Sequence, residues 1–282
     1  EGKTFQLAAQ TNQRVNFRRS ETGKSPGQQQ SSTQTPIQIV ELALLNDAYI
    51  RTVTRESINV IKSIDEIQAT EINVRIDSGD SRAIGPGNIR SIREGDPQPT
   101  PGAQVAAEMG NDDSVLSYLQ IAFAGQIIGN IKQRNATVND QVRCVYGPAE
   151  NWETRYDPDA TAISGDEIYL NCSQLKLNQW QPVGRKKPVV EIAAVGNTEI
   201  EGKKFRAIAS QLTYTEQNEN ILLEGLRREN AKIWFRKNDK QPWQYGEAKR
   251  FRYQRSTSEI IGSEEVKEMR FLQFEAPQRR RK

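Results

Sequence analysis

The sequence contains no histidine among its 282 residues. This absence removes the commonest general base and the commonest metal ligand at neutral pH. It also excludes every Ser-His and Cys-His nucleophile arrangement. We therefore expect a non-enzymatic protein that has no catalytic residues, binds no metal and uses no cofactor.

Cysteine is also scarce, because Cys144 and Cys172 are the only two. Two cysteines cannot supply the four ligands of a structural zinc site. Cys144 shares the parity of Val142, and Cys172 shares that of Ile168 and Leu170, so both are predicted to point inward from strands. A disulfide between neighbouring strands and two separate buried thiols both fit this pattern.

The chain also lacks a strong charge imbalance and long apolar runs. Its formal net charge is +3, from 39 basic and 36 acidic residues, which is too balanced to indicate a nucleic-acid partner. No apolar run approaches the roughly 18–20 residues that span a bilayer, so we expect no transmembrane segment. The one dense basic run lies at residues 279–282, within a predicted basic tail at 277–282.

The residues that are present favour β-structure. Hydrophobic residues make up 35% of the chain and charged residues 27%, a balance that suits a sheet with one dry face and one wet face. From residue 115 onward, short apolar-polar alternations are separated by turn signals such as Gly147-Pro148 and Gly196-Asn197. No long amphipathic helix is indicated. The pattern predicts an all-β fold of stacked antiparallel strands.

Composition divides the chain into four predicted parts. Residues 1–76 are N-terminal strands that carry a polar, disordered insertion at 18–36. Residues 77–114 are rich in Gly, Pro, Asp and Ser and are predicted to be a loop or linker. Residues 115–276 are the main β-domain, and the basic tail follows.

A short strand pattern recurs in the sequence. It has a small residue followed three and five positions later by large apolar or aromatic residues, and its copies begin at Ala69, Gly165, Ala209 and Ala248. The two large residues share one face of a strand. The small residue has the opposite parity on a straight strand, so we expect a bend or bulge beside it, where strands turn a corner.

Residues 188–261 resemble the OstA/LptA-like family, the β-jellyroll modules of lipopolysaccharide transport. In that family, one strand ends in Gly-Asn, as at Gly196-Asn197 here. Two strands have the form Ala-x-x-Φ-x-Tyr, where Φ is a large apolar residue, and they correspond to Ala209/Leu212/Tyr214 and Ala248/Phe251/Tyr253. A further strand of the form Φ-x-L-x-G corresponds to Leu223/Gly225. The resemblance implies an open, twisted β-jellyroll, or β-taco, whose interior is an apolar groove. It also implies a location in the periplasm or at the outer membrane.

What the family does suggests a function for this chain. The resemblance implies a lipid-binding envelope protein that passes lipopolysaccharide or a similar glycolipid along the groove and stacks on other β-jellyroll modules through edge strands. The candidate groove residues are Ile168, Leu170, Leu212, Tyr214, Leu223, Ile233, Phe235, Phe251 and Tyr253. The main alternative is a structural or adhesive stacked-sheet protein with a sealed core and no ligand. A carbohydrate-binding or hydrolytic β-sandwich, suggested by pairs such as Asp157/Asp159, is a third.

Overall fold

The fold was obtained as a computed structural model. It describes residues 4–10, 14–19, 39–94, 116–158, 167–180, 189–215, 220–236, 238, 241–254, 257 and 259–271, and the side chains among these from residue 41 to residue 267. Every regular element in these ranges is a β-strand, so the predicted all-β class is confirmed. The predicted insertion at 18–36 was wrong at its first two residues, because Arg18 and Arg19 belong to strand β2 (Arg14–Arg19). Its remaining residues and the predicted basic tail lie outside the described residues.

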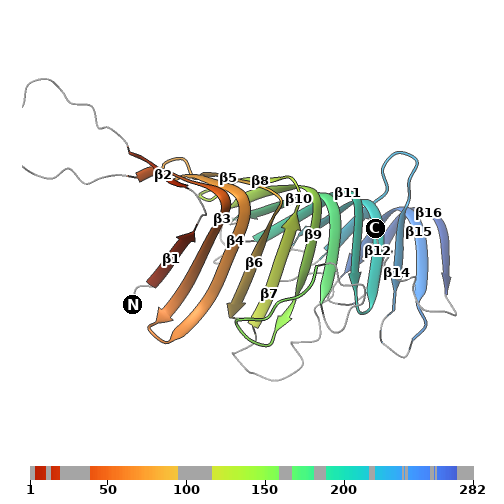
Figure 1. The fold of residues 1–282 in the computed structure, drawn as a ribbon. Coiled ribbons are helices and arrows are strands. Elements are labelled where there is room, and N and C mark those ends of the chain that lie inside the picture. Colours follow the sequence, from red (N-terminus) through yellow and green to blue (C-terminus); the bar gives the residue numbers. More distant parts are fainter. Residues whose placement is uncertain are drawn as a thin grey trace, which may run out of the picture.

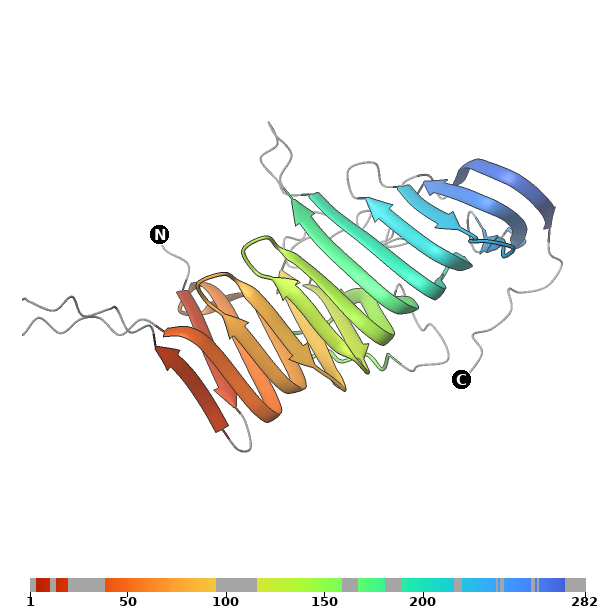
Figure 2. The same cartoon turned by 90° about the horizontal axis from the view of Figure 1, so that it is seen from above.

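The strands form one antiparallel sheet of 16 strands that does not close into a barrel. They follow one another from the N-terminal end of the molecule to the C-terminal end, as Figures 1 and 2 show. Within the described strands, β1 (Thr4–Gln10) and β2 (Arg14–Arg19) pair only with β3 (Ile39–Ser57), and β16 (Glu259–Phe271) pairs only with β15 (Gln244–Gln254). The sheet therefore ends in edge strands at both ends of the molecule.

The sheet is folded along its length into two halves, which we call limb A and limb B. Long strands run through both limbs, and five of them pair with a different short strand in each. For example, residues 63–68 of β4 (Val60–Arg75) pair with β6 (Gly87–Glu94), whereas residues 71–74 pair with β5 (Asp80–Ile84). The long strands are β3 (Ile39–Ser57), β4 (Val60–Arg75), β9 (Asn135–Ala149), β10 (Ile168–Trp180), β11 (Val189–Gly202), β12 (Phe205–Thr215), β15 (Gln244–Gln254) and β16 (Glu259–Phe271).

The short strands belong to one limb each. Limb A contains β1 (Thr4–Gln10), β6 (Gly87–Glu94), β7 (Leu116–Phe123) and β14 (Ala231–Phe235). Limb B contains β2 (Arg14–Arg19), β5 (Asp80–Ile84), β8 (Gln126–Asn130) and β13 (Asn220–Glu224). The long strands turn over at the line where the limbs meet, which we call the corner, as can be followed in Figure 1.

Strands that pass from limb A to limb B turn the corner at a small buried residue. Ala69 in β4, Ala209 in β12 and Ala248 in β15 are all buried there. Ala209 and Leu212 are three residues apart, so on a straight strand they would face opposite sides. Both lie in the same core cluster, because the strand bends between them. The first three residues of the sequence repeat therefore mark the place where the strand turns the corner.

Strands that return from limb B to limb A use a different device. Their corner residues have positive φ: Asn46 and Asp47 in β3, Asp140 and Gln141 in β9, Gly196 and Asn197 in β11, and Glu265 in β16. The ladder register shifts at three of these corners, between Leu45 and Ala48 in β3, between Asn139 and Val142 in β9, and between Val195 and Thr198 in β11. Glycine is required at position 196, because a Cβ atom there would lie 2.7 Å from Ser173 Oγ. Bulges of this kind increase local twist and redirect a strand.

The sequence pattern misplaced one copy of the repeat. Gly165 lies outside the described residues, and β10 turns the corner at Cys172, seven residues later. In β10 the residues that follow the repeat pattern at the corner are Cys172, Leu175 and Leu177, and cysteine takes the place of alanine. A buried thiol is small and apolar enough to occupy this position.

The predicted loop or linker at 77–114 was also wrong in its first part. Residues 80–84 form β5 and residues 87–94 form β6, which join the N-terminal strands to the rest of the sheet. The Gly85-Pro86-Gly87 sequence between them is a corner, not a linker. A Cβ atom on Gly87 would lie 2.4 Å from the carbonyl oxygen of Gln68, so this strand needs glycine to approach its neighbour. Residues 95–115 lie outside the described residues.

Candidate functional site: the interior between the limbs

The interior is a continuous apolar layer between the facing surfaces of the two limbs. It extends from Leu44 in β3 to Tyr253 in β15, and large residues such as Phe123, Val142 and Phe251 lie in one cluster. Because inward residues alternate with outward ones on each strand, both limbs contribute a row of apolar side chains. The result is an apolar interior that runs nearly the whole described length of the sheet.

The structure brings the predicted groove residues together. Eight of the nine belong to the core cluster, and Leu170 packs against it. Those eight are Ile168, Leu212, Tyr214, Leu223, Ile233, Phe235, Phe251 and Tyr253, with exposed fractions between 0% and 8%. The Tyr253 ring lies 4.7 Å from the ring of Phe205, another residue of the core cluster, centroid to centroid. The side chains therefore fill the space between the limbs at this end of the molecule.

Sequence reasoning missed the N-terminal half of this interior. Leu44, Ile72, Ile121 and Val138 are buried in the same cluster as eight of the nine predicted residues. A signal for it was present, because the pattern at Ala69 places Ile72 on the inner face. The strand-like run from Leu119 to Phe123 carried a similar signal.

Both cysteines lie in this interior, at neighbouring positions of β9 and β10. Cys144 is opposite Leu170 and Cys172 is opposite Val142, so the two thiols are diagonal neighbours on one face. Both are free thiols in the structure. Burial raises the pKa of Cys172 to about 12 and raises the pKa of Cys144 well above its ordinary value. Neither thiol has the low pKa of a reactive cysteine.

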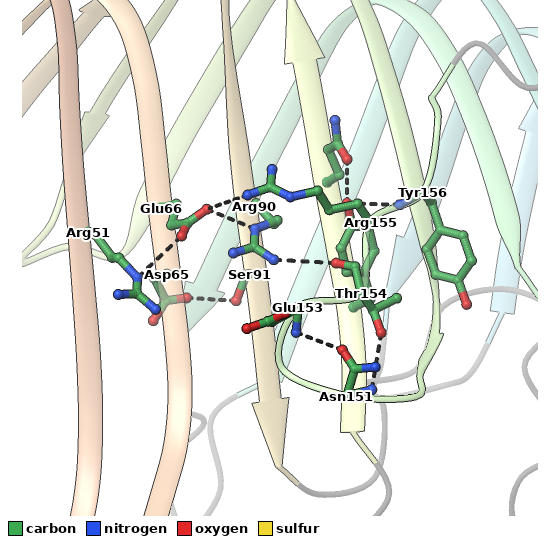
Figure 3. A network of polar contacts seen from close by, with 12 residues as sticks. Arg51, Asp65, Glu66, Arg90, Ser91, Asn151, Glu153, Thr154, Arg155 and Tyr156 are labelled. Atoms are coloured by element: carbon green, nitrogen blue, oxygen red, sulfur yellow. Dashed lines mark hydrogen bonds and ion pairs between the residues drawn. The ribbon is translucent and has the colours of Figure 1, made fainter.

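A polar network occupies the outer face of limb A, and Figure 3 shows it from close by. Its centre is the carboxylate of Glu66, which is 2.8 Å from Arg90 Nε and 3.3 Å from Arg51 Nε. Arg155 Nη2 lies 4.0 Å away. Burial raises the pKa of Glu66, but hydrogen bonds from Arg90 and Tyr49 and the nearby positive charges outweigh this effect and lower the pKa overall.

The segment at 149–158 crosses this outer face and is held by the same network. Arg90 Nη1 donates a hydrogen bond to the carbonyl oxygen of Thr154, at 3.3 Å. The backbone N–H of Tyr156 donates to Tyr118 Oη at 3.3 Å, and the two rings meet edge to face with centroids 5.0 Å apart. Three arginine side chains surround the carboxylate of Glu66 and keep it ionised. A catalytic acid must hold a proton, so this arrangement is better explained by a structural role.

No other constellation with catalytic or metal-binding geometry emerges from the described part of the chain. Among those residues there is no group of three or more Cys, Asp or Glu side chains arranged to hold a metal ion. Of the carboxylates that suggested a hydrolytic fold, Asp157 is exposed, Glu264 forms an ion pair with Arg250, and Asp159 lies outside the described residues. None of the described segments is a helix with the length and hydropathy needed to cross a membrane.

Comparisons of the chain with protein-family models, with curated proteins and with solved structures gave no match.

Proposed function

We propose that this protein carries lipopolysaccharide or a similar glycolipid in the periplasm or at the outer membrane, without covalent chemistry. The acyl chains would lie between the limbs, against the inward residues of β10 to β15. The observation that carries the proposal is the apolar interior, which is continuous from Leu44 to Tyr253. Each buried CH₂ group contributes about 0.8 kcal/mol, so an acyl chain gains substantially from such a surface.

The way the limbs are joined supports the same proposal. Among the described strands, the ladder hydrogen bonds connect the limbs along the corner only, because each short strand pairs within a single limb. Opening the opposite side would separate side chains but would break no hydrogen bond of the ladder. This matters because interior residues such as Leu212 and Phe251 have almost no solvent exposure, and a ligand needs the limbs to move apart.

The proposal also includes a partner, a second β-jellyroll module, and the edge strands of the sheet could bind it. In the described strands, β16 has a neighbour on one side only, so its outer backbone groups can accept another strand. Light scattering at increasing protein concentration tests this step. Replacing exposed Ile261 and Val266 of β16 with lysine should keep the protein monomeric if assembly uses this edge.

One observation favours a second candidate, a structural or adhesive sheet with a sealed core. Eight of the nine proposed groove residues are at most 8% exposed, so the interior is filled in this conformation. A filled interior is also what a protein without a ligand requires.

Photocrosslinking separates the two candidates. A photoreactive amino acid is placed at Leu212 or Phe251, and also at Leu170, which is only half buried and tolerates the change best. Matched controls carry it at Ile208 and Arg252, exposed positions on the same strands as Leu212 and Phe251. The proposal expects envelope glycolipid to be captured from the interior positions. Capture from the controls alone would leave the sealed-core candidate.

A further inference from the structure

Three neighbouring tips at the free rim of limb B present large apolar side chains to solvent. Ile76 lies in the turn between β4 and β5, Ile131 in the turn between β8 and β9, and Trp180 at the end of β10. Their exposed fractions are 50%, 61% and 42%. Single exposed apolar residues are ordinary on protein surfaces, but a row of them along one rim indicates an interaction site.

Backbone hydrogen bonds fix the three tips beside one another. The N–H of Ile131 donates to the carbonyl oxygen of Gly79 at 2.8 Å, which joins the first turn to the second. The N–H of Gln179 donates to the carbonyl oxygen of Arg134 at 3.0 Å, which joins the second turn to the end of β10. The apolar side chains are thus carried on a preformed frame and need no folding on contact with a partner.

Cationic side chains accompany these tips. Arg75, Lys132 and Arg134 are exposed in or next to the two turns. Lys132 Nζ donates a hydrogen bond to the carbonyl oxygen of Asp77, which holds this cation at the rim.

Two carboxylates face the same region, Asp77 and Asp80. Asp77 Oδ1 accepts a hydrogen bond from the backbone N–H of Ser78 at 2.8 Å. The carboxylate of Asp80 accepts hydrogen bonds from Ser78 at 2.7 Å and Asn130 at 2.8 Å. Arg75 lies opposite a third carboxylate, Glu41 of β3, so the exposed cations available to a partner are mainly Lys132 and Arg134, in the same turn as Ile131.

We propose that this rim, formed by Ile76, Ile131 and Trp180, docks the protein on the surface of a bilayer that contains anionic phospholipid. Isoleucine side chains suit the boundary of the acyl region, and tryptophan prefers the headgroup level. Lysine and arginine beside them are attracted to anionic headgroups. The docking is peripheral, and it uses neither the interior nor the edge strands, so it stands independently of the proposed function.

Vesicle flotation with the full chain tests the proposal. The wild-type protein should float with vesicles of phosphatidylcholine mixed with phosphatidylglycerol, and rising salt should weaken this association. A triple variant, Ile76→Ser with Ile131→Ser and Trp180→Ser, should bind at least about tenfold more weakly. The matched control is Ile58→Ser, because Ile58 is 89% exposed in the β3–β4 turn, on the rim of limb A, and should bind as the wild type does.

Charge reversal and quenching make the test specific. Lys132→Glu with Arg134→Glu should abolish the preference for phosphatidylglycerol. Brominated phosphatidylcholine in the mixed vesicles should quench tryptophan fluorescence of the wild type, and Trp180→Phe should remove this quenching while the protein still floats. The proposal is overturned if the wild type ignores both vesicles or binds pure phosphatidylcholine equally well. It is overturned equally if the triple variant binds unchanged, if Ile58→Ser loses as much binding, or if quenching survives in Trp180→Phe.

Discussion

Ala231 and Ala248 face each other across β14 and β15 at the corner of the sheet, and both side chains are fully buried. The same pairing of small residues occurs at the other end, where Ala48 of β3 lies opposite Ala69 of β4. Two bent strands can approach this closely only where neither carries a large side chain. We therefore expect the corner to be sensitive to side-chain size.

Replacing Ala248 with leucine should destabilise the protein by about 1–3 kcal/mol, because the extra methyl and methylene groups overpack the corner. Urea unfolding followed by circular dichroism measures the loss. Arg252→Leu is the control, because residue 252 is an exposed position on the same strand and should change stability little. Equal losses in the two variants would mean that the corner has no special demand for a small residue.

The corner also shows how far sequence can predict this fold. The repeat, a small residue followed three and five positions later by large apolar residues, locates the corners at Ala69, Ala209 and Ala248. On a straight strand the small residue and the large residues would face opposite sides, but the bend at the corner places them all on the inner face. The return corners carry no such pattern. Asn46, Asp140 and Glu265 share only a positive φ, and their polar side chains resemble those of ordinary turns.

The interior of the C-terminal half could be predicted because its strands alternate regularly. β5 and β6 could not, because Gly85-Pro86-Gly87 has the composition of a loop, and only the neighbouring strands reveal it as a corner. The network around Glu66 could not be predicted from the sequence either. Arg51, Glu66 and Arg90 lie on three strands, and only the register of those strands brings their side chains together.

The two cysteines should resist alkylation in the folded protein. With a pKa of about 12, only about one Cys172 thiol in 10,000 is ionised at pH 8, and its burial also blocks the reagent. Mass spectrometry after treatment with N-ethylmaleimide should show no addition to the native protein and two additions after unfolding without reductant. Two additions that appear only after reduction would reveal a disulfide between Cys144 and Cys172.

Replacing Arg90 with methionine should destabilise the protein by about 2–4 kcal/mol, because it removes the best-buried cation beside Glu66 and leaves that carboxylate with exposed partners. It also removes the hydrogen bond to the Thr154 carbonyl, so amide exchange in residues 150–156 should accelerate. Lys62→Met is the control, since Lys62 pairs with Glu56 and Glu94 on the surface and should leave exchange in this segment unchanged. Unchanged exchange in Arg90→Met would show that the segment is held by Tyr118 and Tyr156 alone.

Acid should weaken a second outer-face contact, the one around Glu247. Its carboxylate accepts hydrogen bonds from Asn230 at 3.0 Å and Lys267 at 2.9 Å through Oε1, and from Tyr245 at 2.9 Å through Oε2. These bonds, that of Asn230 foremost, lower the pKa of Glu247 from 4.5 to about 2. A carboxylate whose folded pKa is depressed contributes stability above its unfolded pKa. This contribution is therefore complete above about pH 4.5 and disappears as the pH falls toward 2.

The variant Glu247→Gln isolates this contribution, because glutamine keeps the shape but cannot ionise. We expect it to be roughly 1–3 kcal/mol less stable than the wild type near neutral pH, and the gap to narrow at about pH 3. Urea unfolding of both proteins at the two pH values measures the difference, and other carboxylates cancel because both proteins share them. Glu264→Gln is the control: Glu264 is an exposed partner of Arg250, so its gap from the wild type should be smaller at both pH values. A gap for Glu247→Gln that is equally large at both pH values would show that glutamine disturbs packing and that the ionised carboxylate adds nothing.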